Sequence, residues 1–385
     1  MDEEFLIAGG GIAGLSAALA IAATGRKARV FEQAKKFQEF GAGLQMGPNA
    51  GHALEQLGIA AKVDEFAGFP EEVCILDGIS GKVLNSVTLG EEFIVRYGAP
   101  YRVIHRGDLL RVLVNACTNR KAVELNRGAK VTGIEHDGDG ATLVLGRKRV
   151  TGAGIIGADG VRSTVRAMTL KDGPPELAGH VIGRAIVPAD IMPFPEPAVC
   201  LWLLPRGHVV HYPIRGGDDF NLVAAFTSEW DEQDWNARTE KAEIEVHFEH
   251  STGLVRQILA AAPEWRKWVA ADRAPRGRWG DGPVTLLGDA AHAVLPYFAQ
   301  GAAMALEDAC VLARMLENES DVAKAMRAYE DERSPRVGRL NEMSRKLGSA
   351  YHAGGPVRLV RNAILRAMSE NASRNRLDWV YRWKT

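Results

Sequence analysis

The stretch Phe5-Leu-Ile-Ala-Gly-Gly-Gly-Ile-Ala-Gly14 decides the fold of this chain. Its apolar start predicts a short buried strand, and the glycines then open a helix that stops at Gly25. Gly9 permits a tight turn, Gly11 lets the backbone approach a pyrophosphate, and Gly14 lets the helix pack closely on the strand. This order of strand, turn and helix is typical of a dinucleotide-binding unit.

The residues that follow the turn indicate the kind of nucleotide. The N–H groups at the helix start, among them those of Ile12 and Ala13, face the phosphates in such a unit, and the helix dipole favours them. A second apolar run, Ala28-Arg-Val-Phe31, ends in Glu32, eighteen residues beyond Gly14. An acid there accepts hydrogen bonds from a ribose diol and repels a 2′-phosphate. We therefore expect an unphosphorylated adenosine, as in FAD or NAD.

Composition excludes several classes of protein. The chain has 385 residues and a formal net charge of −1, with no long basic run that would bind nucleic acid. Its length favours two connected domains. The four cysteines are scattered without a CxxC pair, which supports neither a metal site nor a disulfide framework and favours a reducing cytosol.

A membrane segment is the main rival interpretation of the opening stretch. Residues 5–25 form a run of 21 residues without a charge, long enough to span a bilayer. The run contains five glycines, however, and Asp2, Glu3 and Glu4 precede it instead of basic residues. We therefore expect no membrane association.

A second informative stretch begins with the apolar strand that ends at Gly157-Ala-Asp159-Gly160. Arg162 and Ser163 then begin a helix, so Asp159 lies at the carboxyl end of a strand, where ligands bind in such folds. Alone, this pattern could be a capped helix start. Beside the first motif, it predicts a second contact to the same nucleotide.

A third stretch, residues 283–308, separates FAD from NAD. A buried strand delivers Asp289, which is placed to bind a polyol chain, and a loop leads through Pro296 to a helix start. The first N–H groups of that helix favour the negative charge at the pyrimidine edge of a reduced flavin. NAD has neither a ribityl chain nor this anion. The residues that carry these groups are Gly301, Ala302, Ala303 and Met304.

Two further segments are expected near the ligands. The glycine-rich loop of residues 40–50, which includes Gln45, either contacts cofactor or substrate or serves only as a connection. Arg106 stands where a strand joins a helix. It could reach a phosphate or the flavin edge, or make a helix-cap salt bridge.

The rest of the pattern predicts a second, mostly antiparallel sheet that could roof a pocket. Alternating residues and turn signals mark strands within 73–87 and four more strands further along the chain. These four are His180–Val187, Ala198–Leu204, His208–Ile214 and Asn221–Thr227. Helices are expected near Glu240–His250 and over Leu254–Ala262, and mostly helical sequence follows from Glu307.

Together these motifs resemble the single-component FAD-dependent aromatic hydroxylases of the 4-hydroxybenzoate hydroxylase class. Within it, residues 41–49 and 296–308 look most like salicylate 1-hydroxylase, 3-hydroxybenzoate 6-hydroxylase and 6-hydroxynicotinate 3-monooxygenase. The resemblance implies an α/β fold: a Rossmann-like FAD-binding domain of the glutathione-reductase type, an interleaved antiparallel-sheet substrate domain and C-terminal helices. We assign 1–72, 100–178 and 281–340 to the FAD domain, 73–99 and 179–280 to the substrate domain, and 341–385 to the helical segment.

The resemblance also implies a reaction. NADH or NADPH reduces the flavin, oxygen adds to give a C4a-hydroperoxide, and its distal oxygen is transferred to the ring of a phenolic or hydroxypyridine carboxylate. By the same resemblance, Pro296 brings its carbonyl near the reactive flavin carbon. Glu32 contacts FAD and so does not distinguish NADH from NADPH. The ring, the position hydroxylated and a monomer or homodimer state stay open.

The strand His208–Ile214 carries the expected substrate chemistry. Alternation places His208 and Tyr212 on one face, about 13 Å apart, and His211 on the other. A base must take the phenolic proton, and relatives that act on 6-hydroxynicotinate and 3-hydroxybenzoate look similar in carrying a His and a Tyr at this spacing. His208 and Tyr212 are therefore the expected catalytic pair, with His211 as the fallback if the register slips. Tyr297 either binds substrate or only packs, and His292 is expected to be structural.

Two other functions fit parts of this pattern. One is a flavin-dependent reductase or dehydrogenase of the same fold acting on a larger substrate. The other is a redox sensor that binds the nucleotide without catalysis. Asp289 and the helix start at Gly301 weigh against the sensor because they serve a working flavin.

Overall fold

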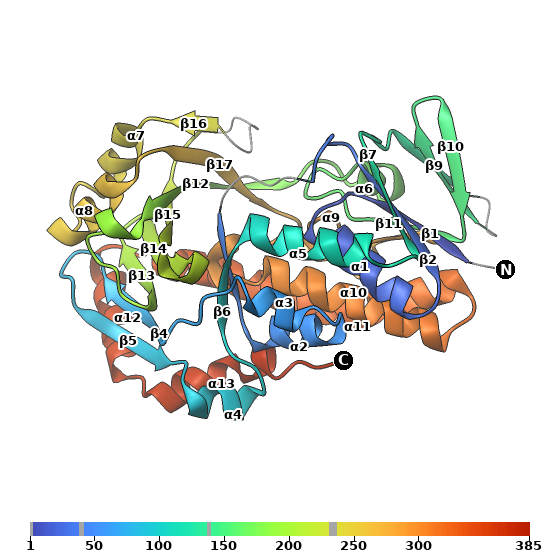
Figure 1. Ribbon diagram of the computed structural model, residues 1–385. Helices are drawn as coiled ribbons and strands as arrows, with labels where there is room; N and C mark the ends of the chain where they lie inside the picture. The colour runs from blue at the N-terminus through green and yellow to red at the C-terminus, as the bar shows by residue number, and fades with distance from the viewer. Residues whose placement is uncertain (1–2, 38–41, 137–139, 231–236) are drawn as a thin grey trace.

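The computed structural model describes residues 3–37, 42–136, 140–230 and 237–385. Two large sheets organise it, one at each end of the molecule in Figure 1. Helices join them along one side. No helix in the described ranges combines the length and apolar character needed to cross a membrane.

The first sheet is parallel and contains the opening strand at its centre. Residues 5–8 of that strand are fully buried, as expected for a strand covered on both faces. The sheet order is β18 (Val284–Leu286), β11 (Gly154–Gly157), β1 (Glu4–Ala8), β2 (Lys27–Glu32) and β7 (Val123–Arg127). Helix α1 (Ile12–Ala23) packs between α5 (Arg106–Thr118) and α10 (Gly301–Asn318). A small antiparallel sheet of β8 (Gly133–His136), β9 (Ala141–Leu145) and β10 (Lys148–Gly152) links β7 to β11.

The second sheet has eight strands, and all its pairings are antiparallel except that of β13 with β4. Its order is β16 (Ala237–Thr239), β17 (Trp265–Asp272), β12 (Glu176–Pro188), β15 (Asp219–Thr227), β14 (Gly207–Ile214), β13 (Ala198–Leu204), β4 (Glu72–Asp77) and β5 (Val83–Thr88). The sequence pattern does not predict β17. This strand forms because the long strand β12 offers it an edge to pair with, a contact between segments far apart in the chain.

The two faces of this sheet meet different surroundings. The outer face is covered by α7 (Lys241–Glu245), η3 (Val246–Phe248) and α8 (Gly253–Ala261). The inner face meets a ribbon of β3 (Gly43–Met46) and β6 (Arg102–His105). Gly43 shows how closely they pack: a Cβ there would lie 2.6 Å from the Tyr212 ring, and its N–H donates to Asn221 at 2.6 Å.

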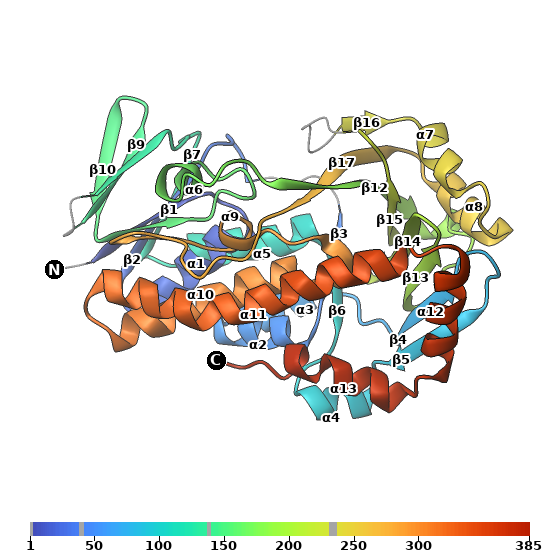
Figure 2. The ribbon, with the colours of Figure 1, turned by 180° about the vertical axis from the view of Figure 1, so that it is seen from behind.

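Helix α11 (Val322–Tyr351) connects the two ends of the molecule, as Figure 2 shows from behind. It begins beside the parallel sheet and ends at β14, where Tyr351 and His352 contact the ring of His208. The remaining helices are α2 (Pro48–Gln56), α3 (Ala60–Asp64), α4 (Glu91–Tyr97), α6 (Thr164–Thr169), α9 (Asp289–His292), α12 (Gly355–Ala367) and α13 (Glu370–Tyr381), with short turns η1 (Ala189–Ile191), η2 (Arg215–Gly217) and η4 (Pro296–Phe298).

The aromatic residues of the tail pack on the body of the protein. Tyr381 is 7 % exposed and belongs to the main core. The Arg339 guanidinium lies 3.9 Å from the centre of the Trp379 ring, and Arg336 donates to the Trp379 carbonyl at 2.8 Å. These contacts hold the C-terminal helix α13 against α11 and the main core.

Candidate active site

The first glycine motif forms a turn that admits no side chain at two positions. Gly9 has φ +105°, and a Cβ there would lie 2.3 Å from the Ala158 carbonyl oxygen. A Cβ on Gly14 would lie 2.0 Å from the Gly9 carbonyl oxygen. Helix α1 has no side-chain cap at Gly11 and no acid in its first turn. The N–H groups around Ile12 are thus arranged for an anion such as a pyrophosphate.

Glu32 lies against this turn. Its carboxylate accepts hydrogen bonds from the Gly10 N–H at 2.8 Å and the Ala34 N–H at 2.7 Å. The acid at the tip of β2 is therefore held beside the glycines, where the ribose of a dinucleotide lies in folds of this kind.

Asp289 stands beside the same turn, although it is 275 residues from Gly14 in the sequence. The preceding Gly288 packs so closely that a Cβ would lie 2.9 Å from the Ala13 side chain and 3.3 Å from that of Ala305. Asp289 itself is exposed. Burial lowers the pKa of Arg106, and the negative charge of Asp289 acts in the opposite direction, so the two side chains are close enough to interact.

The start of α10 completes this arrangement. Gln300 precedes the helix without capping it by its side chain, and the first turn contains no acid. Gly301 and Ala302 are half-buried, whereas Ala303 and Met304 are buried. Pro296, at the end of the loop that leads here, is exposed. We call residues 9–14, Glu32, residues 288–289 and residues 301–304 the FAD cradle, because their donors and close backbone approaches fit this cofactor.

A buried ion network holds the cradle from behind. Asp308 accepts from the Gly288 N–H at 3.0 Å, from His292 at 2.5 Å and from Arg333 at 2.6 Å. Arg333 also pairs with Glu307 at 2.6 Å. Burial alone raises the pKa of Asp308, but the charges of His292 and Arg333 outweigh it and lower that pKa to about 2. His292 thus has the structural role expected of it. The sequence did not reveal that the carboxylate of Asp308 fixes the turn before Asp289.

The carboxylate of Asp159 forms hydrogen bonds with the start of helix α6. It accepts from the Thr164 N–H at 2.7 Å, the Val165 N–H at 3.2 Å and the hydroxyl of Ser163. Burial raises its pKa. Asp159 thus has one of the two roles considered for it, a cap at the start of α6, and its contact to the nucleotide stays a prediction.

The inner face of the eight-stranded sheet gathers other predicted residues. Tyr212 is 2 % exposed, and burial raises its pKa, an effect that Gln45 and Arg184 partly oppose. Gln45 also accepts a hydrogen bond from Tyr101 at 2.8 Å. The β3–β6 ribbon therefore brings Gln45 to Tyr212, while Arg184 approaches from β12.

His208 lies on this face too, at one end of a chain of hydrogen-bonded rings. Its Nδ1 is 2.9 Å from His352 Nε2, His352 Nδ1 is 3.3 Å from His180 Nε2, and His180 Nδ1 is 2.6 Å from the Tyr297 hydroxyl. We call these four residues the histidine chain. Burial, with the charges of His352 and His180, lowers the pKa of His208 well below 6.5. The described residues contain no group of three or more His, Cys, Asp or Glu arranged to hold a metal ion.

His211 is the predicted residue that the structure does not bring to this face. It is 0 % exposed and stacks on Trp202 in the outer core, 6.3 Å between ring centres. Neither ring nitrogen has a hydrogen-bond partner among the described residues, and burial lowers its pKa to about 3. The register of β14 pairs His208 with Ala225, so the register slip that would exchange the two histidines does not occur.

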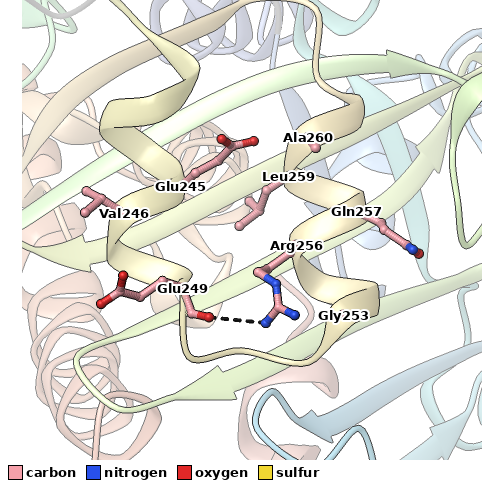
Figure 3. Close-up of a pocket in the computed structure, with 8 residues that line it drawn as sticks. All are labelled: Glu245, Val246, Glu249, Gly253, Arg256, Gln257, Leu259 and Ala260. Carbon is pink, nitrogen blue, oxygen red and sulfur yellow. Dashed lines mark hydrogen bonds between the residues drawn. The ribbon is translucent and has the colours of Figure 1, made fainter.

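A separate hollow lies on the outer side of the sheet, between α7 and α8 (Figure 3). It has a volume of about 570 Å³ and is open to solvent. The Arg256 guanidinium reaches from α8 toward the facing helical segment and donates a hydrogen bond to the Glu249 carbonyl at 3.2 Å. The sheet separates this hollow from His208, Tyr212 and the cradle, so it does not belong to the candidate active site.

Comparisons with known proteins agree with this geometry. The FAD binding domain family matches residues 2–344. The chain is 39% identical to 3-hydroxybenzoate 6-hydroxylase of Polaromonas naphthalenivorans, covering 99% of this chain and 96% of that protein. It is 33% identical to 6-hydroxynicotinate 3-monooxygenase of Bordetella bronchiseptica, covering 88% and 89%. The structure of Klebsiella pneumoniae HpxO complexed with FAD and uric acid superimposes with a TM-score of 0.88 at 26% identity, covering 98% and 96%.

The chain therefore belongs to the FAD binding domain family and is an FAD-dependent monooxygenase of the aromatic hydroxylase class. Hydroxylases of this class use NAD(P)H and O2. The relatives named above are hydroxylases and monooxygenases, and neither a reductase nor a redox sensor is among them.

Proposed function

We propose that this member of the family hydroxylates a phenolic or hydroxypyridine carboxylate, of the kind named in 3-hydroxybenzoate 6-hydroxylase and 6-hydroxynicotinate 3-monooxygenase. The observation that carries the proposal is the buried His208, which shares the inner face with Tyr212. The reaction consumes one O2 and one NAD(P)H. One oxygen atom enters the ring in place of hydrogen, and the other leaves as water.

FAD, when bound, supplies the activation of oxygen. The protein's contribution is to hold the cofactor and exclude water. Asp289 would bind the polyol chain, and the free N–H groups at Gly301 and Ala302 would face the pyrimidine edge, where reduction places negative charge. Pro296 would direct its carbonyl toward the reacting edge of the ring system. The closed inner face around Tyr212 keeps the reaction away from bulk water.

The substrate ring becomes electron-rich when a base removes its phenolic proton. His208 suits this role because its lowered pKa keeps the imidazole neutral at physiological pH. When its Nδ1–H donates to His352, the Nε2 atom of His208 carries a lone pair that accepts the proton. In the same arrangement, His352 donates an N–H to His180, and His180 donates an N–H to the Tyr297 oxygen.

The histidine chain thus orients His208 and couples its tautomer to those of His352 and His180. With the opposite polarity, the Tyr297 hydroxyl donates to His180, and every following N–H reverses until His208 Nε2 becomes a donor. His208 in that state cannot act as a base. Tyr297 is therefore a positioning residue for His208, and Tyr212 grips the opposite end of the substrate.

NADH oxidation by the FAD-loaded protein tests this function. The assay compares salicylate, 3-hydroxybenzoate and 6-hydroxynicotinate with a sample lacking aromatic compound, and each organic product is identified. We expect one of the three compounds to stimulate oxidation and yield a hydroxylated product. Peroxide without organic product in every case would contradict the proposed substrate class and leave the flavin assignment in place.

A further inference from the structure

Arg184 is a half-buried cation on the inner face, and it belongs neither to the glycine motifs nor to the histidine chain. It lies on β12 in one transverse row with Val223 of β15 and Val210 of β14. Val210 is the residue between His208 and Tyr212 on that face. Two strand spacings, about 10 Å, separate the backbone of Arg184 from that of Val210. The side chain of Arg184 therefore lies on the same face of the sheet as His208 and Tyr212.

Among the residues that the structure describes, no carboxylate pairs with the guanidinium of Arg184. Its Nε atom is inaccessible to solvent and has no hydrogen-bond partner, and the described residues offer Arg184 neither a hydrogen bond nor an ion pair. The guanidinium carbon lies 3.8 Å from the centre of the Trp268 ring. Burial and the like charge of Arg106 lower the pKa of Arg184 to about 9, so it stays charged at neutral pH. Burying such a cation is costly unless an anion pairs with it.

The chemistry of the Arg184 side chain indicates which anion it would bind. A guanidinium presents a planar fork of donors that matches a carboxylate in two parallel hydrogen bonds. The Trp268 ring lies 3.8 Å from the guanidinium carbon and limits the freedom of the side chain, which reduces the entropy lost on binding. The charge of Arg184 also reaches the Tyr212 hydroxyl, whose pKa it lowers against the effect of burial. A ligand held by Tyr212 or His208 would thus have Arg184 beside it.

We infer that Arg184 binds the carboxylate of the aromatic substrate and selects acids over neutral phenols. This inference rests on the proposed function, which it deepens by assigning a specificity residue. Arg184 would orient the ring between the carboxylate end and the hydroxyl that faces His208. The FAD cradle is built from other elements, β2, α1, α9 and α10 with the turns before them, so the cofactor would have its own partners.

The test measures binding of 3-hydroxybenzoate and of 3-hydroxybenzamide to the FAD-loaded protein by the change in flavin absorbance. The variants are Arg184→Gln, Arg184→Lys and Arg266→Gln. Arg266 is the matched control, since it pairs with Arg184 across β17 and β12 and already has Glu264 at 3.0 Å. Bound FAD per protein is recorded for each variant and shows that it has folded.

We expect the wild type to prefer the acid, and Arg184→Gln to bind it about 10- to 100-fold more weakly without change for the amide. Arg184→Lys should recover part of this loss, and Arg266→Gln should behave as wild type. Equal affinity for acid and amide in the wild type, binding of neither compound, or an unchanged preference in Arg184→Gln would overturn the inference. If Arg184→Gln lost FAD, or if only its KM for NADH rose, Arg184 would serve another ligand, and the inference would also be overturned.

The outcome is separable from that of the proposed function. A hydroxylated product from a ring without a carboxylate would leave the proposed reaction in place and end the inference about Arg184. Absence of any hydroxylated product would reject the reaction, whatever Arg184 binds.

Discussion

The FAD cradle and the inner face of the eight-stranded sheet offer their proposed ligands different kinds of group. The cradle presents backbone groups, and glycines such as Gly9 and Gly14 are present because a Cβ would collide. The inner face presents the side chains of His208, Tyr212 and Arg184, which we propose contact the substrate. Backbone recognition depends on a rigid frame, whereas side-chain recognition depends on which face of a strand a residue occupies.

The ion network behind the cradle should show the largest effect on stability. Replacing Arg333 by Leu removes the guanidinium that the buried carboxylates of Glu307 and Asp308 share, so that Glu307 depends on Arg336 and Asp308 on His292. We expect a loss of about 3–5 kcal/mol in the free energy of unfolding. Urea denaturation measures it. Arg314→Leu, which breaks a half-exposed pair with Glu332, is the control and should cost less than about 1 kcal/mol. Similar losses in both variants would contradict the idea of a rigid frame.

On the inner face, His208→Ala should separate catalysis from cofactor binding. We expect hydroxylation to fall about 10²- to 10⁴-fold, because the substrate keeps its phenolic proton, while bound FAD per protein stays that of the wild type. Product analysis and flavin absorbance measure the two quantities. Unchanged turnover would remove His208 from the mechanism.

Gly14→Ala tests the backbone side of the comparison. The new Cβ would lie 2.0 Å from the Gly9 carbonyl oxygen, so the turn must shift, and we expect a loss of about 1–3 kcal/mol together with weaker FAD retention. Thermal unfolding and the flavin content after gel filtration measure both. Gly253→Ala, at the start of α8 with open space around it, should leave both quantities unchanged. Full FAD retention in Gly14→Ala would show that the close approach is dispensable.

The histidine chain predicts how stability depends on pH. The folded pKa values of His180, His208 and His352 lie below 6.5, so below that pH the unfolded chain binds protons that the folded chain does not. The free energy of unfolding should therefore fall as pH drops below 6.5, by about 1.4 kcal/mol per pH unit for each histidine that stays neutral. Urea titrations between about pH 5 and 8 measure the slope. His352→Gln should decline less steeply, and an identical slope would contradict a neutral His352.

The smallest effect is expected on the outer face. His211→Phe removes two ring nitrogens that lack partners and keeps an aromatic ring against Trp202. We expect activity equal to wild type and a stability change within about 1.5 kcal/mol, of either sign. Loss of hydroxylation in this variant would show that the face of the strand does not decide the role of its histidines.

Local sequence patterns anticipated the arrangement of the cradle residues better than that of the residues on the inner face. The glycine turn and Glu32 lie within one βαβ unit, and Asp289 follows a strand in a recognisable motif. The residues next to each of these positions therefore indicate its expected role. Alternation on β14 also separated His208 from His211 correctly. Asp159 shows the limit of such patterns, because a ligand contact and a helix cap share the same sequence signal.

Contacts between segments far apart in the chain could not be predicted from local sequence patterns. His352 meets His208 across 144 residues, and only the length and direction of α11 bring them together. Arg184 carries no motif either, since a strand residue with one charge is ordinary until its face and its lack of a partner are known. The pairing of β17 with β12, which places Trp268 under Arg184, belongs to the same class of contact.

Incorporation of isotopically heavy dioxygen tests the central claim most directly. FAD-loaded protein, NADH and the aromatic carboxylate that stimulates NADH oxidation are incubated under labelled dioxygen, and the product is examined by mass spectrometry. We predict that the ring gains a single heavy oxygen atom for each NADH consumed in productive turnover. A hydroxyl oxygen derived from water, or NADH oxidation that proceeds equally well without oxygen, would contradict a monooxygenase that works on the inner face of this sheet.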